Sequence, residues 1–221
     1  MTATKAERAF LPAAGRDSFL PLYDPLAKIL GVDTARRILL DQAALQPQHR
    51  VLDVGCGTGS LSVLIKRLYP TVTVIGVDPD PTALARAGRK AKRAGTPIRF
   101  DRGFADALGY PDAAFDRVFS SMVLHHLEDS GKERALREIR RVLRPGGYLE
   151  LLDFSSADSH RHGALSRLIH SHHQLKDNVE TRILELMTTA GFVGPHKLGD
   201  HGLILGRVAF FRAAAPTAMW E

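Results

Sequence analysis

The sequence predicts an α/β fold, a doubly wound and mostly parallel sheet with helices on both of its faces. Between residues 50 and 154, short apolar or β-branched stretches alternate with segments of helical periodicity. This alternation is typical of right-handed β-α-β units, which place parallel strands under a cover of helices. The first apolar stretch ends in a turn with glycine at Gly55, Gly57 and Gly59, and sheets of this class bind their ligands beside such a turn.

The chain begins with segments of helical spacing. Apolar residues over 20–30 and 34–45 predict two helices, and Asp33 is placed to cap the second. Because a domain averages roughly 150 residues, the 221 residues of the chain predict one domain with additions. We expect residues 1–45 to form a helical lid segment and residues 46–221 to form the main domain.

Strands and helices are expected in regular order across the main domain. The expected strands are RVLDV (50–54), TVTVIGV (71–77), IRF (98–100), FDRVFSS (115–121) and YLELLDF (148–154). The expected helices are SLSVLIKRLY (60–69), a segment that begins at Asp80 and Pro81, and KERALREIRRVL (132–143). Residues 155–178 are polar, contain five histidines and predict an insertion. A helix near 179–190 and two short segments around 195–198 and 203–212 follow.

Composition narrows the class of partner. The formal net charge is +6, but the basic residues are dispersed, and the densest patch, 86–95, has the spacing of a solvated helix face. A small molecule is therefore expected as partner rather than nucleic acid, with peripheral membrane contact as an alternative. The single cysteine, Cys56, excludes an internal disulfide and a cysteine-rich zinc site. No apolar run has the length of a signal-peptide core or of a membrane span, so a cytoplasmic protein is expected.

The glycine turn distinguishes between two kinds of nucleotide. It reads Asp53-x-Gly55-x-Gly57-x-Gly59, whereas the dinucleotide fingerprint G-x-G-x-x-G has its third glycine one residue later. Asp53 would repel a pyrophosphate by a few kcal/mol at low dielectric, but it would attract an ammonium or a sulfonium. Asp78 ends the second expected strand, 23 residues after Gly55, where a carboxylate can accept both hydroxyls of a ribose. The turn therefore favours a cationic cofactor without phosphate.

Five segments in this order resemble the class I S-adenosylmethionine-dependent methyltransferases. They are VLDVGCGTG, GVDPDPTAL, GYPDAAFDRV, LHHLED and EIRRVLRPGGYLELLDF. The resemblance covers residues 45–155 closely and the remainder more loosely. It implies a Rossmann-like sheet of seven strands, mostly parallel with an antiparallel last strand, and S-adenosyl-L-methionine as the cofactor.

The resemblance also implies where this cofactor binds. The methionine end would lie along the glycine turn, with Asp53 near its amino group, and the ribose would lie on Asp78. Relatives of the quinone-pathway type hold the adenine amino group with an aspartate where this chain has Phe104. We expect Phe104 to stack on the ring or Asp106 to supply the acceptor. The other expected cofactor residues are Tyr23, Gly55, Cys56, Gly57, Thr58, Gly59, Pro79, Ala105 and Ser121.

Methyl transfer needs a general base only when the acceptor must lose a proton. His125 and His126, which follow the fourth expected strand, are the candidate bases. The alternative for both is a packed, hydrogen-bonded ring with a structural role. The histidines of the insertion raise the question of a metal, but only Asp158 accompanies them at ligand spacing, so no metal site is predicted.

Two kinds of observation indicate the class of methyl acceptor: features that the sequence lacks, and a second resemblance. SSMVLHH after the fourth strand lacks the Pro-Pro-aromatic pattern of base methyltransferases, and one thiol does not suit metalloid methylation. FLPLYDPLAKILGVDTARRIL and GLILGRVAFFRA are similar to the ubiquinone/menaquinone C-methyltransferase group. We therefore expect a quinone-like aromatic acceptor under a lid that includes Phe19, Tyr23, His170 and His173. A phospholipid amine N-methyltransferase, an NAD-dependent oxidoreductase and a catalytically silent cofactor-binding protein remain alternatives.

Overall fold

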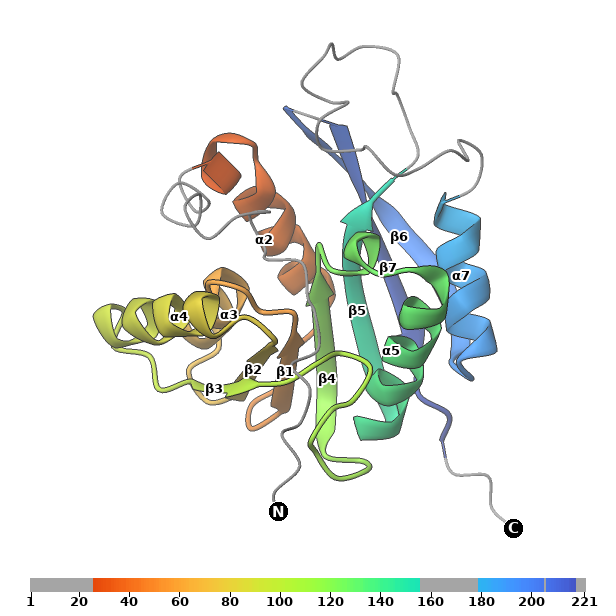
Figure 1. Ribbon diagram of the computed structural model, residues 1–221, viewed down its shortest axis with the longest axis horizontal. Helices are drawn as coiled ribbons and strands as arrows, with labels where there is room; N and C mark the ends of the chain where they lie inside the picture. Colours follow the sequence, from red (N-terminus) through yellow and green to blue (C-terminus); the bar gives the residue numbers. More distant parts are fainter. Residues whose placement is uncertain (1–25, 156–178, 205, 218–221) are drawn as a thin grey trace, which may run out of the picture.

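The computed structural model describes residues 26–155, 179–204 and 206–217, and these residues form one α/β sheet structure (Figure 1). The strands are β1 (Arg50–Val54), β2 (Thr73–Asp78), β3 (Arg99–Arg102), β4 (Phe115–Ser121), β5 (Leu143–Phe154), β6 (Val193–Leu203) and β7 (Gly206–Ala214). The helices are α2 (Val32–Gln42), α3 (Ser60–Leu68), α4 (Pro81–Arg93), the 3-10 helix η2 (Leu124–His126), α5 (Asp129–Val142) and α7 (Val179–Thr189).

The sheet has seven strands in the order β3-β2-β1-β4-β5-β7-β6. Strands β1 to β5 are parallel, and β7 runs antiparallel to both of its neighbours, β5 and β6. This confirms the doubly wound, mostly parallel sheet with an antiparallel last strand. The direction of winding reverses between β1 and β4, and ligands of such sheets bind beyond the carboxyl ends of the strands at that point.

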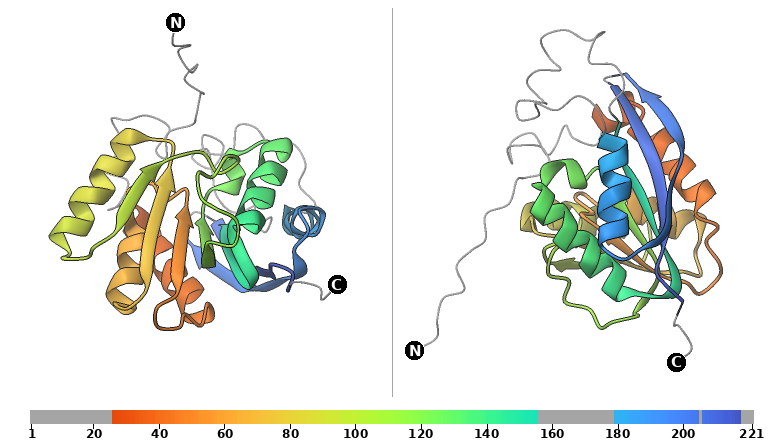
Figure 2. Two further views of the ribbon diagram at one scale, coloured as in Figure 1. Left: turned by 90° about the horizontal axis from the view of Figure 1, so that it is seen from below. Right: turned by 90° about the vertical axis from the view of Figure 1, so that its right-hand side faces the viewer.

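Helices cover both faces of the sheet (Figure 2). On one face, Leu39 of α2 and Ile65 of α3 pack against Phe119 of β4. On the other face, Ile139 of α5 and residues of α7 pack in a cluster that includes Val118 of β4. Adjacent residues of β4 thus belong to opposite cores, as the alternation of side chains along a strand requires.

Several boundaries differ from the sequence-based expectation, among them those of α2, α5 and β6. Helix α2 starts at Val32 after Gly31, whose φ of 89° is left-handed, so Asp33 lies in the first turn and does not cap the helix. Helix α5 begins at Asp129, before the expected start at 132. Strand β6 is longer than expected: it is an edge strand with mostly exposed or half-buried side chains, so it lacks the apolar alternation that identifies a strand in a sequence.

Parts of the expected lid lie outside the described residues, namely Phe19, Tyr23 and all but one residue of the insertion at 155–178. Of the lid segment 1–45, residues 26–45 are described, and they include α2. In the part of the chain that the structure describes, no helix has the length and apolar character needed to cross a membrane.

Candidate functional site

A cavity of about 450 Å³ lies beside the carboxyl ends of the central strands. Its wall comes from the glycine turn after β1, the end of β2, the loop after β3, the segment after β4, the start of α5 and one residue of α2. Most of the expected cofactor residues line it: Gly55, Cys56, Gly57, Thr58, Asp78, Pro79, Phe104, Ala105, Asp106 and Ser121. His126 lines it too. Its volume is in the range of small-molecule and cofactor sites, roughly 300–1,000 Å³.

The glycine turn is packed too closely for side chains. Gly55 has a φ of 70°, and a Cβ there would lie 2.3 Å from Cγ2 of Val123. Gly59 has a φ of 74°, and its Cβ would lie 2.8 Å from Cβ of Ala87 in α4. The backbone N–H of Gly55 donates to the carbonyl of Val77 at the end of β2. The turn therefore presents backbone to the cavity, as close approach of a ligand requires.

Asp78 is oriented by backbone donors at the end of β2. Its Oδ2 accepts from Gly57 N at 2.8 Å, and its Oδ1 accepts from Asp80 N at 2.9 Å. Burial raises the pKa of Asp78. Asp80 caps α4 by accepting from Thr82 N and Ala83 N, so Asp78 is not needed as the cap of this helix. Each Asp78 oxygen has a further lone pair for a ligand hydroxyl.

Asp53 and Gly59 are not part of the cavity wall. Asp53 is 1% exposed, and its Oδ2 accepts a hydrogen bond of 2.5 Å from the Ser62 hydroxyl of α3. Burial raises the pKa of Asp53 to about 6, against the opposing effects of the Ser62 hydrogen bond and the charge of Arg36. The structure therefore places this carboxylate beneath the turn, where it affects the cavity through its charge.

Residues beyond β3 form the opposite wall. Phe104, Ala105 and Asp106 all line the cavity, and Asp106 forms an ion pair of 3.4 Å with Arg134 of α5. Phe104 and Asp106 therefore both lie on the cavity wall, and their contacts with the adenine remain a prediction. Ser121 closes the end of β4, and its buried hydroxyl has no hydrogen-bond partner among the described residues.

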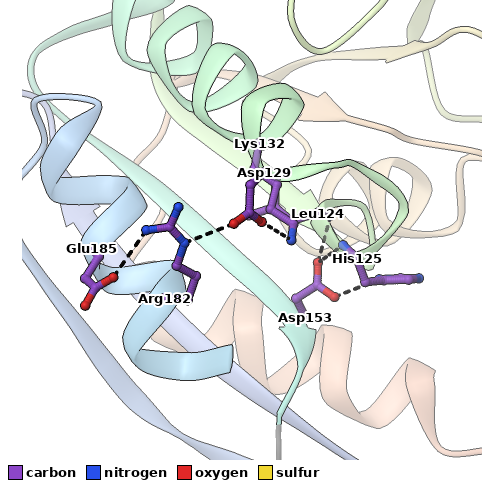
Figure 3. A network of polar contacts seen from close by, with 7 residues as sticks. All are labelled: Leu124, His125, Asp129, Lys132, Asp153, Arg182 and Glu185. Atoms are coloured by element: carbon purple, nitrogen blue, oxygen red, sulfur yellow. Dashed lines mark hydrogen bonds and ion pairs between the residues drawn. The ribbon is translucent and has the colours of Figure 1, made fainter. Parts of the chain in front are cut away.

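His125 is held by Asp153, which ends β5 (Figure 3). The ring Nδ1 of His125 lies 2.7 Å from Asp153 Oδ1. Asp153 is 2% exposed and also accepts from Leu124 N, His125 N and Phe154 N. Burial acts to raise the pKa of Asp153, but His125 and the backbone donors hold it below its ordinary value. A carboxylate in this position fixes the tautomer with hydrogen on Nδ1 and leaves Nε2 as an acceptor.

His126 has a different environment. Its ring lies against that of His125, with centroids 3.9 Å apart. Desolvation by the surrounding protein, followed by the charge of His125, lowers the pKa of His126 to about 4. The ring is therefore neutral near pH 7, on the wall of the cavity, whereas His125 does not line that cavity.

Two residues of the site were missed from the sequence, Asp153 and Arg36. Asp153 stands at the carboxyl end of a parallel strand, which was a usable signal. Arg36 lines the cavity, and the sequence carried a signal for it too, because it falls on the apolar stripe of α2. The other buried residues of that helix are Val32, Ala35, Leu39 and Leu40.

Within the described ranges, no group of three or more histidine, cysteine or carboxylate side chains lies close enough to hold a metal ion. The histidines at 160, 162, 170, 172 and 173 lie outside those ranges.

The central region of the chain is similar in sequence to known proteins. A family model described as a methyltransferase domain matches residues 51–147. The chain is 39% identical over 158 residues to a demethylmenaquinone methyltransferase of Deinococcus radiodurans, covering 70% of this chain and 65% of that protein. It is 41% identical over 137 residues to a demethylmenaquinone methyltransferase of Thermus thermophilus, covering 61% of each. The matches span less than two thirds of these relatives' own length.

Solved structures share the fold. The YcgJ protein of Bacillus subtilis superposes with a TM-score of 0.69 at 19% identity, over 84% of this chain and 99% of that one. A phosphoethanolamine N-methyltransferase of Haemonchus contortus, solved in complex with S-adenosyl-L-methionine, gives a TM-score of 0.73 at 17% identity. That comparison covers 97% of this chain and 61% of the other.

Proposed function

The chain belongs to the class I S-adenosylmethionine-dependent methyltransferases, and from this membership we propose that it methylates an aromatic carbon of a quinone-like small molecule. The observation that carries the proposal is the similarity, at 39% and 41% identity, to two proteins named demethylmenaquinone methyltransferase. The phospholipid amine alternative has no comparable support. The amine N-methyltransferase among the similar structures, which is named for phosphoethanolamine, resembles this chain in fold alone, at 17% identity.

The cavity fits the cofactor of this family. S-adenosyl-L-methionine supplies a methyl group on a positively charged sulfur, which is already activated for in-line displacement. In this proposal Asp78 accepts the ribose hydroxyls and Phe104 and Asp106 contact the adenine, and all three residues line the cavity. The glycine turn admits the chain that joins sulfur to the amino acid, because nothing larger than a hydrogen fits at Gly55. The protein's contribution is to position the reactants and to exclude water.

An apolar acceptor suits the segment after β4. Met122, Val123 and Leu127 line the cavity together with Ser121. The expected lid residues Phe19, Tyr23, His170 and His173 lie outside the described residues, and their closing of the acceptor pocket stays a prediction.

Methylation of an aromatic carbon replaces hydrogen, so a proton must leave the acceptor. We assign its removal to His125. Asp153 holds Nδ1 of this ring at 2.7 Å, which orients Nε2 as the acceptor and stabilises the imidazolium that forms. His126, whose neutral ring packs against that of His125, lines the cofactor cavity.

Transfer of a labelled methyl group tests the proposal. The protein is incubated with S-adenosyl-L-methionine labelled in its methyl group and a 1,4-naphthoquinol that lacks the ring methyl. We expect mass spectrometry to find the label on a ring carbon. Label on the amine of phosphatidylethanolamine vesicles would instead establish the phospholipid alternative. Binding of S-adenosyl-L-methionine without methyl transfer to any acceptor in a bacterial lipid extract would establish a silent binding protein. Tight binding of NAD without binding of S-adenosyl-L-methionine would establish an oxidoreductase.

Replacement of Asp78 tests the ribose contact. We expect Asp78→Ala to weaken binding of S-adenosylhomocysteine at least about tenfold, since a charged hydrogen-bond partner contributes about 1.5–3 kcal/mol. The apo protein should also lose about 1–3 kcal/mol of unfolding free energy, because Gly57 N and Asp80 N lose their acceptor. Calorimetric titration and thermal unfolding measure the two effects. The exposed Asp41 gives the control, and Asp41→Ala should change neither. Unchanged affinity in Asp78→Ala would remove this residue from the site.

A further inference from the structure

Arg36 is a buried cation that the fold itself does not explain. It lies on the inner face of α2 and is 7% exposed, although arginine is almost never fully buried unless it is paired. Its packing neighbours on the same helix, such as Ala35 and Leu39, belong to the apolar core. A charge in this position needs an anionic partner to offset its desolvation.

The described contacts of Arg36 use only part of its guanidinium. Nη1 donates to Asp33 Oδ1 at 3.2 Å, and the Asp33 side chain is 52% exposed. Nε is buried and has no hydrogen-bond partner among the described residues. Arginine carries five N–H donors in a planar fork that matches a carboxylate. Because Arg36 also lines the cavity, its guanidinium is within reach of a ligand there.

The charges along the cavity wall indicate which chemical group of a ligand would meet Arg36. Among the described residues, Arg36 and Arg134 are the two arginines of the wall, and Arg134 is paired with Asp106. Asp53 lies beneath the glycine turn, and the charge of Arg36 favours its ionised form. Since Asp53 does not reach the wall, it offsets the charge of Arg36 without occupying its outward donors.

We propose that Arg36 binds the α-carboxylate of the cofactor's methionine end. The inference rests on the proposed function, because it takes the cofactor from the family. It assigns the amino-acid end of the cofactor to α2, an element outside the matched domain at 51–147.

Calorimetry on the wild-type protein tests the carboxylate contact. Three ligands are compared: S-adenosylhomocysteine, its decarboxylated analogue, and 5′-methylthioadenosine, which lacks the whole amino-acid end. We expect S-adenosylhomocysteine to bind about 10- to 100-fold more tightly than the decarboxylated analogue, because a charge-assisted fork is lost. Equal affinities would overturn the inference. Failure of the wild-type protein to bind any of the three would overturn the proposed function as well.

Variants then assign the contact to Arg36. Arg36→Met should remove the preference for S-adenosylhomocysteine and leave the affinity for 5′-methylthioadenosine within about twofold. Arg37→Met is the matched control, since Arg37 is the exposed neighbour on the same helix, and it should behave as wild type. An equal loss for both ligands in Arg36→Met would show a structural role and overturn the assignment. If Arg36→Met does not fold, Arg36→Lys replaces it and should reduce the preference in part.

Discussion

His125→Ala is expected to lower kcat for the naphthoquinol acceptor by about 10²- to 10⁴-fold, the usual contribution of a general base. The base is lost, whereas the cofactor cavity is not lined by His125, so the affinity for S-adenosylhomocysteine should stay within about twofold. Single-turnover kinetics and calorimetry measure the two quantities. Wild-type turnover in this variant would return the role of base to His126 or show that none is needed.

Asp153→Asn separates positioning from catalysis. The amide keeps the size of the side chain but loses the charge that holds Nδ1 of His125, so kcat should fall by about 10²-fold. Nitrogen chemical shifts of the His125 ring report the tautomer, and we expect one tautomer in the wild type and a mixture in Asp153→Asn. An unchanged ring signal together with reduced kcat would contradict the positioning role.

Gly55→Ala is expected to abolish measurable cofactor binding, with a loss of more than about 100-fold. The new Cβ would lie 2.3 Å from Cγ2 of Val123, so the turn must shift out of the position that admits the ligand. The left-handed φ of 70° adds backbone strain to this steric clash. The free energy of unfolding should therefore fall by about 2–5 kcal/mol. Calorimetric titration and chemical unfolding measure the two effects.

Gly95→Ala gives the control for backbone strain. Gly95 has a φ of 65° with nothing within 4 Å of a built Cβ, so this variant should lose only about 1–2 kcal/mol and bind the cofactor normally. Val123→Ala in the Gly55→Ala background should recover part of the stability, because it removes the atom that clashes. Cofactor affinity within twofold of wild type in Gly55→Ala would contradict the close approach of the ligand to this turn.

Local sequence determined the elements that the site is built on. β1 and β4 have the bounds expected from the sequence, 50–54 and 115–121, because a central strand is covered on both faces and is therefore mostly buried. The cap of α4 by Asp80 was also local, since the acceptor and its donors are two and three residues apart. The glycine turn and the carboxylate of Asp78 were likewise contained in a short stretch of the chain.

Tertiary structure decided which charges face the ligand. Asp53 and Asp78 end neighbouring strands in the sequence pattern, but only Asp78 reaches the cavity, because the turn and Ser62 of α3 cover Asp53. The pairing of His125 with Asp153 joins residues 28 positions apart. Arg36 comes from a helix before the sheet begins. Periodicity reports which face of an element is buried, but it does not report what a buried charge meets there, since that partner is supplied by a distant element.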